Sequence, residues 1–353
     1  MMMRKVSKIA KLGRLLGAFG LALLAPTAYA DEVMLKVSHF LPPNSGAQQA
    51  VIQPWCEKLA ADSGGRLKCQ IYPAMQLGGT PGQLFDQVRN GVADVVWTLP
   101  GFATGRFPAI EAMELPFMLP ASSLAGSRAV WEFYQRHAQK EFESYKVLAL
   151  HGDPGIAFHT LKTPVKNLES VKGLKLRTPS RMASRFVAAL GGTPVSMPPA
   201  QVAEAISKGV VDGSMASWEL VPAAKLDEVT RFHTSEPPGE PGFSSVVLGL
   251  FMNRQKYESL PADLKAVIDR NSGAPLVDAF GRAWDATAAQ ARKRVREQGG
   301  QDLTVTLADY EEMRKAAAAV EQEWLKDAAA KALDGPALVA GARAVAARHL
   351  KKP

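Results

Sequence analysis

The sequence predicts an α/β fold built from two related halves. Strand-like and helix-like stretches alternate over residues 33–99, an order typical of parallel strand–helix–strand units. Two distant stretches, 84–97 and 202–216, share one pattern, in which a short helix is followed by Gly-Val-x-Asp and then by a strand. This internal echo favours two α/β units of similar construction.

The first unit begins with a strand of alternating apolar residues at 33–40. The helix that follows, over 46–65, contains Pro54, which either kinks it or starts a fresh first turn. Thr80 is the expected N-cap of a later, shorter helix, with a proline directly after it. The remaining elements of this unit are, in order, a strand over 66–73, that helix over 80–91, and a buried strand over 92–99.

The later part of the chain continues the alternation and then becomes mostly helical from residue 260 onward. One long helix is predicted over 307–328, with an apolar stripe that we interpret as packing. The stripe consists of Tyr310, Met313, Ala317, Val320 and Trp324. The other predicted elements are helices over 122–145, 180–190 and 200–209, and strands over 146–152, 155–160, 174–177, 210–216 and 244–253.

The first 30 residues are expected to be a signal peptide outside the fold. Five basic residues, an apolar stretch over 15–25 and a small-residue site ending at Ala30 follow one another, which is the pattern of a secretory signal. Cleavage after Ala30 leaves 353 − 30 = 323 residues, enough for two domains or one large one. Loss of the five signal cations lowers the net charge from +8 to +3, so the basic composition does not indicate nucleic-acid binding.

Cys56 and Cys69 are the only cysteines. Export places them in an oxidising compartment, and each lies on the apolar face of its element, where the helix should pack on the strand. We predict a disulfide between them, which contributes about 3 kcal/mol in the chain-entropy model; two buried thiols are the alternative. Neither cysteine has a histidine near it in the sequence, which argues against a nucleophile.

Motifs for nucleotide, metal and hydrolase chemistry are missing from the sequence. It contains no phosphate-binding glycine pattern behind a strand, no HExxH and no GxSxG, and its six histidines are scattered. We therefore predict no cofactor and no metal site. An enzyme has no positive support, although Glu114, Asp212 and Glu219 are carboxyl groups that an active site could recruit.

Arg177 ends the short apolar strand over 174–177 and is followed by a Thr-Pro turn and a helix. Ligands of open α/β sheets bind outside the carboxyl ends of strands, and the planar guanidinium binds a carboxylate through two hydrogen bonds. The residues alone leave two interpretations open. Arg177 either anchors an organic carboxylate or forms a structural salt bridge with a side chain such as Glu114 or Asp212.

Several stretches resemble the substrate-binding proteins of tripartite ATP-independent periplasmic (TRAP) transporters, the DctP-like family. The densest likeness is "VKGLKLRTPSRMASRFVAALGGTPVSMPPAQVAEAISKGVVDG", and further likeness lies in "HFLPPNS", "SGGRLKCQIYPAMQLGG", "MELPFML" and "ESLPADLKAVID". The arginine that ends the "GLKLR" strand is the usual carboxylate anchor of this family, so the resemblance assigns that role to Arg177.

The resemblance also implies a two-lobed periplasmic binding protein fold with mixed sheets. Crossing strands and a long helix would join the lobes, which close on the ligand by a hinge motion. Lobe I would hold residues 31–154 and 243–282, and lobe II residues 155–242 and 283–353. The protein would reside in the periplasm and deliver its ligand to membrane permease subunits, with no nucleic-acid partner.

Loops at strand ends supply the residues expected to line the cleft with Arg177. These are Phe40, Trp97, Leu99, Ser217, Trp218, Glu219 and Phe243. Some family members carry a second arginine in the segment that reads "HGDPGIAFHT" here, and others an asparagine where this chain has "SMASWE"; both are absent. One cation among aromatic side chains favours a monocarboxylate with an apolar or aromatic body, such as an aryl 2-oxo or 2-hydroxy acid.

Three functions follow from these features. The favoured one is a transport receptor that is not an enzyme and captures a small organic carboxylate. The alternatives are a secreted enzyme that acts on such an acid, with Glu219 or Asp212 as the base, and a sensor subunit that docks on a receptor kinase.

Overall fold

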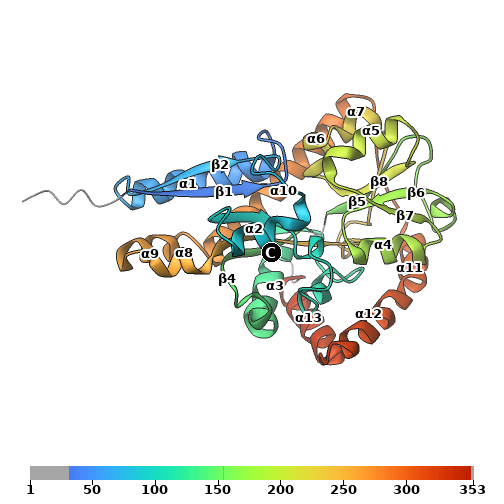
Figure 1. Ribbon diagram of the computed structural model, residues 1–353. Helices are drawn as coiled ribbons and strands as arrows, with labels where there is room; N and C mark the ends of the chain where they lie inside the picture. The colour runs from blue at the N-terminus through green and yellow to red at the C-terminus, as the bar shows by residue number, and fades with distance from the viewer. Residues whose placement is uncertain (1–31, 154, 351–353) are drawn as a thin grey trace, which may run out of the picture. The chain divides into compact units, whose positions relative to one another are not determined.

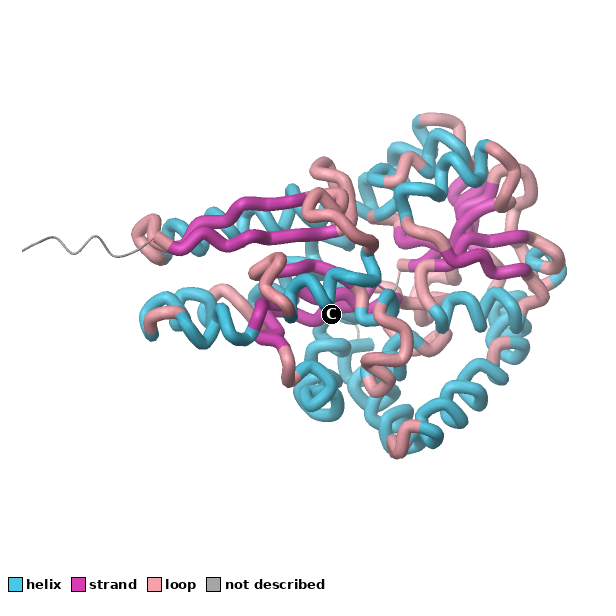
Figure 2. Tube along the Cα trace, viewed as in Figure 1, coloured by secondary structure: helices cyan, strands magenta, loops and turns pink. Residues whose placement is uncertain are grey.

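The computed structural model of the protein describes residues 32–153 and 155–350. Its strands form two separate mixed sheets, one of five strands and one of six, with helices packed around them (Figure 1). Figure 2 shows the two groups of strands apart from each other along the chain trace. The predicted α/β class with mixed sheets is therefore confirmed. The expected signal peptide lies outside the described residues.

The first sheet has the strand order β2-β1-β3-β10-β4. β1 pairs in parallel with both β2 and β3, as the alternation of strands and helices predicted. β10 enters from much later in the chain and pairs antiparallel with β3 and β4. The strands are β1 (Val33–His39), β2 (Leu67–Tyr72), β3 (Val95–Thr98), β4 (Tyr145–Asp153) and β10 (Val246–Asn253).

The helices of the first sheet begin with α1, which starts at Gln53, so Pro54 lies in its first turn. A π-helical turn over Ala47–Ile52 precedes it. The helix predicted over 122–145 is shorter: α3 ends at Phe133 and continues as π and 3-10 turns. The helices are α1 (Gln53–Asp62), α2 (Leu84–Arg89), α3 (Ser123–Phe133), α8 (Arg254–Ser259) and α9 (Ala262–Arg270).

The predicted disulfide between Cys56 and Cys69 is present. It joins α1 to β2, with the two Cα atoms 5.6 Å apart, within the range that a disulfide spans without moving the backbone. Cys56 is buried and Cys69 partly buried. The bond therefore fastens the outermost strand of the first sheet, β2, to the helix that covers it.

The second sheet has the order β11-β9-β5-β8-β6-β7. Three of its strands, β7, β9 and β11, were not predicted, because each has only four residues and none has a long apolar run. The strands are β5 (Ile156–Thr160), β6 (Lys175–Thr178), β7 (Thr193–Ser196), β8 (Gly213–Ser217), β9 (Phe232–Ser235) and β11 (Gln301–Thr304). Its helices are α4 (Arg181–Ala189), α5 (Val202–Ser207), α6 (Leu220–Ala223) and α7 (Leu226–Val229).

The sequence echo between the two halves has a shared structural cause. Asp94, in the turn between α2 and β3, accepts a hydrogen bond from the backbone N–H of Lys36 at 2.8 Å. Asp212, in the turn between α5 and β8, accepts one from the backbone N–H of Lys175, also at 2.8 Å. Each aspartate thus fastens the start of its strand to the neighbouring parallel strand, so the repeated Gly-Val-x-Asp is a structural motif.

One long helix, α10 (Ala274–Glu297), packs on both sheets. It lies against α3 and β4 of the first sheet, and Arg292 on α10 pairs with Asp302 on β11 of the second, with Nη1 and Oδ1 2.7 Å apart. The chain passes between the sheets at three points: from β4 to β5, from β9 to β10, and from α10 to β11. These connections and α10 match the predicted two-lobed fold.

The chain ends with α11 (Leu307–Ala316), α12 (Ala318–Ala330) and α13 (Gly335–Leu350), which run from the second sheet to α3 (Figure 1). The single helix predicted over 307–328 is wrong, because a tight turn at Ala317 divides it; the Val320 N–H bonds to the carbonyl of Ala317, three residues back. The predicted apolar stripe is nevertheless buried along its length. No helix in the described part of the chain has the length and apolar character that a membrane span requires.

Candidate functional site

Six of the eight residues predicted to bind ligand line one cavity at the ends of strands from both sheets. The cavity is small, with a volume of about 40 Å³, well below the roughly 300–1,000 Å³ of sites that enclose a bound ligand. The six are Phe40, Trp97, Leu99, Arg177, Ser217 and Glu219. The cavity wall is mostly apolar, so its few polar groups determine which ligand chemistry it accepts.

Arg177 is the only cation among the residues that line this cavity, and its side chain is 1% exposed. The structure records two hydrogen bonds from its five N–H groups: Nε donates to the carbonyl of Met197 at 3.1 Å, and Nη1 to the carbonyl of Met215 at 3.4 Å. Burial lowers the pKa of Arg177 to about 10, which leaves it charged at neutral pH. No carboxylate among the described residues lies within 4.0 Å to neutralise that charge.

The two carboxyl groups considered as structural partners of Arg177 are engaged elsewhere. Glu114 is buried and accepts a hydrogen bond from the backbone N–H of Val247 at 2.8 Å. Burial raises the pKa of Glu114 to about 8, so it is largely neutral at pH 7. Asp212 holds Lys175 at the opposite end of β6 from the cavity. The salt-bridge interpretation of Arg177 therefore does not describe this structure.

Aromatic rings form a flat wall of the cavity. Phe40 stacks on Trp97 with ring centroids 5.0 Å apart and an interplanar angle of 6°, and Phe102 meets Phe40 edge-on at 5.2 Å. The indole N–H of Trp97 donates to Nε2 of His151 at 3.1 Å, which fixes the plane of the indole. A further aromatic ring bound in the cavity can make the same offset-stacked or edge-to-face contacts with these side chains.

The cavity is also lined by two buried carboxyl groups, Asp153 and Glu219. Burial raises the pKa of Asp153 to about 6, although hydrogen bonds from the Ser217 hydroxyl and from a backbone N–H lower it in part. Burial, together with the charge of Asp153, raises the pKa of Glu219 to about 8. Neither carboxyl group forms an ion pair with Arg177. The cavity therefore holds one cation and two carboxyl groups that are not paired with it.

Two predicted residues, Trp218 and Phe243, do not line this cavity. The Trp218 ring packs beneath the guanidinium of Arg292, 4.3 Å from the ring centroid, and its N–H donates to the hydroxyl of Ser235 at 3.1 Å. Phe243 packs among core aromatics, including Phe158 at 5.4 Å. Residues on either side of Trp218 line the cavity while its own ring points away, so position at a strand end did not determine which way the side chain faces.

Sequence reasoning missed three polar or aromatic residues of the cavity: Phe102, Asp153 and Trp284. Asp153 ends β4 in "HGDPGIAFHT", a segment that the family resemblance marks only for an arginine. Phe102 lies three residues after the end of the predicted strand, and the prediction of site residues stopped at the strand end. Trp284 lies in the middle of α10, and a tryptophan on a helix carries no sequence signal that separates a cavity wall from ordinary packing.

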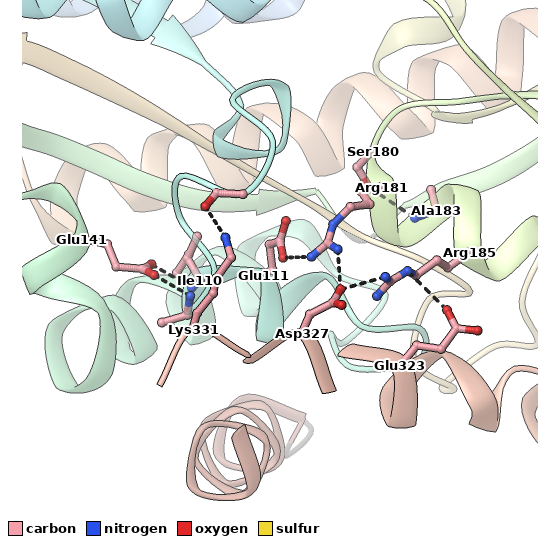
Figure 3. Close-up of polar contacts among 12 residues, drawn as sticks. Ile110, Glu111, Glu141, Ser180, Arg181, Ala183, Arg185, Glu323, Asp327 and Lys331 are labelled. Carbon is pink, nitrogen blue, oxygen red and sulfur yellow. Dashed lines mark hydrogen bonds and ion pairs between the residues drawn. The ribbon is translucent and has the colours of Figure 1, made fainter. Parts of the chain in front are cut away.

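A polar network fixes helix α4, which begins four residues after Arg177 (Figure 3). Ser180 caps α4 by accepting a hydrogen bond from the N–H of Ala183. Arg181 follows at once and forms ion pairs with Glu111 and Asp327, each at 2.5 Å. α4 is thereby tied to the 3-10 turn over Ile110–Glu114 and to α12, so the helix that follows the strand end at Arg177 is held by two distant parts of the chain.

The described residues include no cluster of three or more histidine, cysteine, aspartate or glutamate side chains that could hold a metal ion. The site therefore consists of an unpaired guanidinium, an aromatic wall and two carboxyl groups. Such a set can hold an organic anion in a fixed orientation.

Comparison with known proteins gives consistent matches. The family model described as "Bacterial extracellular solute-binding protein, family 7" matches residues 37–327. A solved TRAP solute-binding protein from a marine metagenome, specific for aromatic acid ligands and in complex with 3-hydroxybenzoate, is 41% identical, with a TM-score of 0.88 over 91% of this chain and 100% of that one.

Two further solved TRAP solute-binding proteins are similar over nearly their whole length. One from Rhodoferax ferrireducens T118, with copurified benzoate, is 39% identical, with a TM-score of 0.87 over 90% of this chain and 98% of that one. One from Bordetella bronchiseptica, with bound (R)- and (S)-mandelate, is 31% identical, with a TM-score of 0.80 over 90% of this chain and 99% of that one.

Proposed function

Because the chain belongs to family 7 of the bacterial extracellular solute-binding proteins, the receptors of TRAP transporters, we propose that it captures an aromatic monocarboxylate and delivers it to membrane permease subunits. The observation that carries this proposal is the buried guanidinium of Arg177, which lines an aromatic cavity and has no carboxylate partner among the described residues. A ligand carboxylate would supply the missing counter-charge and accept two parallel N–H···O bonds.

The cavity's composition supports an aromatic body for the ligand. Phe40 and Trp97, which stack on each other, line the cavity together with Arg177, and Leu99 adds apolar wall. A dicarboxylate would place its second charge where no second cation lines the cavity and where two carboxyl groups do, which is unfavourable in a buried site. The relatives at 41%, 39% and 31% identity hold 3-hydroxybenzoate, benzoate and mandelate, all aromatic monocarboxylates.

The family's receptors are periplasmic, and we place this chain there after cleavage behind Ala30. We propose that it binds and releases its ligand without chemical change. Lobe I would comprise residues 31–154 and 243–282, and lobe II residues 155–242 and 283–353, with closure by a hinge. In support of this division, the strands of the first sheet fall within the first set and those of the second sheet within the other.

A thermal-shift screen of the purified mature protein tests the proposal. Binding raises the melting temperature by mass action, so benzoate, 3-hydroxybenzoate and mandelate should each raise it at millimolar concentration, whereas succinate and galacturonate should not. Isothermal titration calorimetry then gives the affinity and a stoichiometry near one. A shift with the dicarboxylate or the sugar acid but with no aromatic acid would refute the proposed ligand class.

A further inference from the structure

Besides Arg177 and Ser217, three polar side chains line the ligand cavity: Asp153, Glu219 and Trp284. They are 4%, 5% and 1% exposed, respectively. Oε1 of Glu219 has no hydrogen-bond partner among the described residues, whereas Nε1 of Trp284 faces the carboxyl group of Asp153. Buried polar atoms in folded proteins nearly always have partners, so the unpaired oxygen of Glu219 beside the cavity indicates that a partner comes from outside the chain.

The surroundings of Glu219 fix its position. A Cβ atom added at Gly46 would lie 3.3 Å from Oε1 of Glu219, so the carboxyl group packs directly against the backbone that leads into the first sheet's π-helical turn. The nearby N–H groups of Ala47 and Gly46 lower the pKa of Glu219 in part. Glu219 follows β8 of the second sheet, so it is held between segments from both sheets and cannot swing toward Arg177 without losing this packing.

Asp153 and Trp284 complete the same corner of the cavity. Asp153 receives hydrogen bonds from Ser217 and Gly155, and the indole N–H of Trp284 also lowers its pKa. The charge of Asp153 in turn raises the pKa of Glu219, which means that the two carboxyl groups are close enough to influence each other. This corner therefore combines two carboxyl groups and one N–H donor.

Resting on the proposed function, we propose that Asp153, Glu219 and Trp284 form a polar subsite that binds a hydroxyl group on the body of the aromatic carboxylate. A hydroxyl both donates and accepts hydrogen bonds, and the corner offers both: an ionised carboxylate accepts, and a protonated carboxyl or an indole N–H donates. An unsubstituted ring would leave these groups unpaired. A site built to hydrogen-bond a hydroxyl group binds a ligand that lacks one with much lower affinity.

A second carboxylate on the ligand does not fit this corner. It would meet the negative charge of Asp153 at close range in a buried site, and like charges there disfavour binding. The hydroxyl is neutral and avoids that repulsion. The subsite thus selects hydroxylated aromatic monocarboxylates over both unsubstituted aromatic acids and dicarboxylates.

Calorimetric titrations of the mature protein with benzoate, with 2-, 3- and 4-hydroxybenzoate and with the corresponding methoxybenzoates test the proposal. At least one hydroxybenzoate should bind tenfold or more tightly than benzoate, and its methoxy counterpart should lose that advantage. Glu219→Met and Asp153→Leu should each reduce the ratio of hydroxybenzoate to benzoate affinity to below threefold while benzoate still binds.

Glu236→Met is the matched control. Glu236 is a partly buried carboxyl group that lines the adjoining cavity, together with Asp153 and Glu219, but not the cavity that Arg177 lines. Its substitution should preserve the affinity ratio. If either subsite variant fails to fold by circular dichroism, Trp284→Phe, which removes only the N–H donor and keeps an aromatic ring, gives the same test.

The outcomes separate this inference from the proposed function. If wild-type protein binds benzoate and all three hydroxybenzoates equally, the corner holds only an ordered water and the inference is overturned, while the receptor for aromatic acids stands. If an affinity difference exists but survives all three substitutions, the hydroxyl is bound elsewhere and the assignment of residues is wrong. If none of these acids binds, the proposed ligand class itself fails.

Discussion

Replacement of Arg177 by methionine should raise the dissociation constant of the ligand roughly 150-fold while it leaves the ligand-free protein folded. Burial lowers the pKa of Arg177 to about 10, and a shift of this size corresponds to roughly 3 kcal/mol of unfavourable desolvation in the ligand-free state. The substitution removes that penalty. It also leaves the carbonyl groups of Met197 and Met215 without their donor, at a cost of about 1–3 kcal/mol each. The two effects oppose each other, so the free energy of unfolding should change by less than about 3 kcal/mol.

The effect on binding has no such compensation. Truncation of one partner of a buried, hydrogen-bonded charge pair costs about 2–5 kcal/mol, because the ligand carboxylate enters the cavity without a counter-charge. A loss of about 3 kcal/mol corresponds to a dissociation constant roughly 150-fold higher. Arg177→Lys keeps the charge but lacks the planar fork, so it should recover only part of the affinity.

Isothermal titration calorimetry with the tightest aromatic acid, and urea unfolding without ligand, measure the two quantities separately. Arg185→Met is the control, since Arg185 lies on α4 but forms its ion pairs with Glu323 and Asp327; its dissociation constant should stay within threefold of wild type. An Arg177→Met protein that binds the acid with wild-type affinity would refute the anchor assignment. A variant that fails to fold would show that Arg177 is a structural residue.

Four further predictions concern stability and spectroscopic response. Reduction of the Cys56–Cys69 disulfide should lower the free energy of unfolding by about 3 kcal/mol, as measured by urea titration with and without reductant; no change would mean that the bond adds nothing to the stability. Burial lowers the pKa of His151 from 6.5 to about 3, so the unfolded chain binds the proton more tightly, and stability relative to His151→Gln should fall by about 1.4 kcal/mol for each pH unit below 6.5. Burial raises the pKa of Glu114 from 4.5 to about 8, so the folded protein binds the proton of Glu114 more tightly than the unfolded chain does. The stabilisation from this proton is complete below pH 4.5 and is lost as the pH rises toward 8. Glu114→Gln should remove this pH dependence from the free energy of unfolding, measured between pH 6 and pH 9. An aromatic acid should change the tryptophan fluorescence, and Trp97→Phe should remove most of that change; an unaltered response would exclude stacking on this ring.

The parts of the fold that sequence reasoning predicted well are those with strong local signals. The alternating strand that became β1 and the buried strand that became β3 have clear apolar patterns, and the parallel pairing follows from the helices between them. β9 and β11 were missed because they are short, and their pairing depends on contacts between residues about 70 positions apart in the chain. Such contacts leave no periodic pattern in either segment.

The residues of the candidate site also divide into those with a clear sequence signal and those without one. Arg177 was predictable because its place at a strand end and its chemistry both indicate a ligand. Trp218 and Phe243 also stand near strand ends, but the rings point into packing contacts, and side-chain direction in a turn is set by tertiary packing. Trp284 could not have been selected from sequence, since helix α10 carries other buried apolar residues of the same spacing.

The residues that line the ligand cavity come from segments spread between Phe40 and Trp284. Most of the chain must therefore reach its native arrangement before the cavity exists. A molecule with only one sheet formed would not bring Arg177 and the aromatic side chains together. Occupancy of the receptor thus reports completed folding. Misfolded or clipped copies would not compete for the ligand.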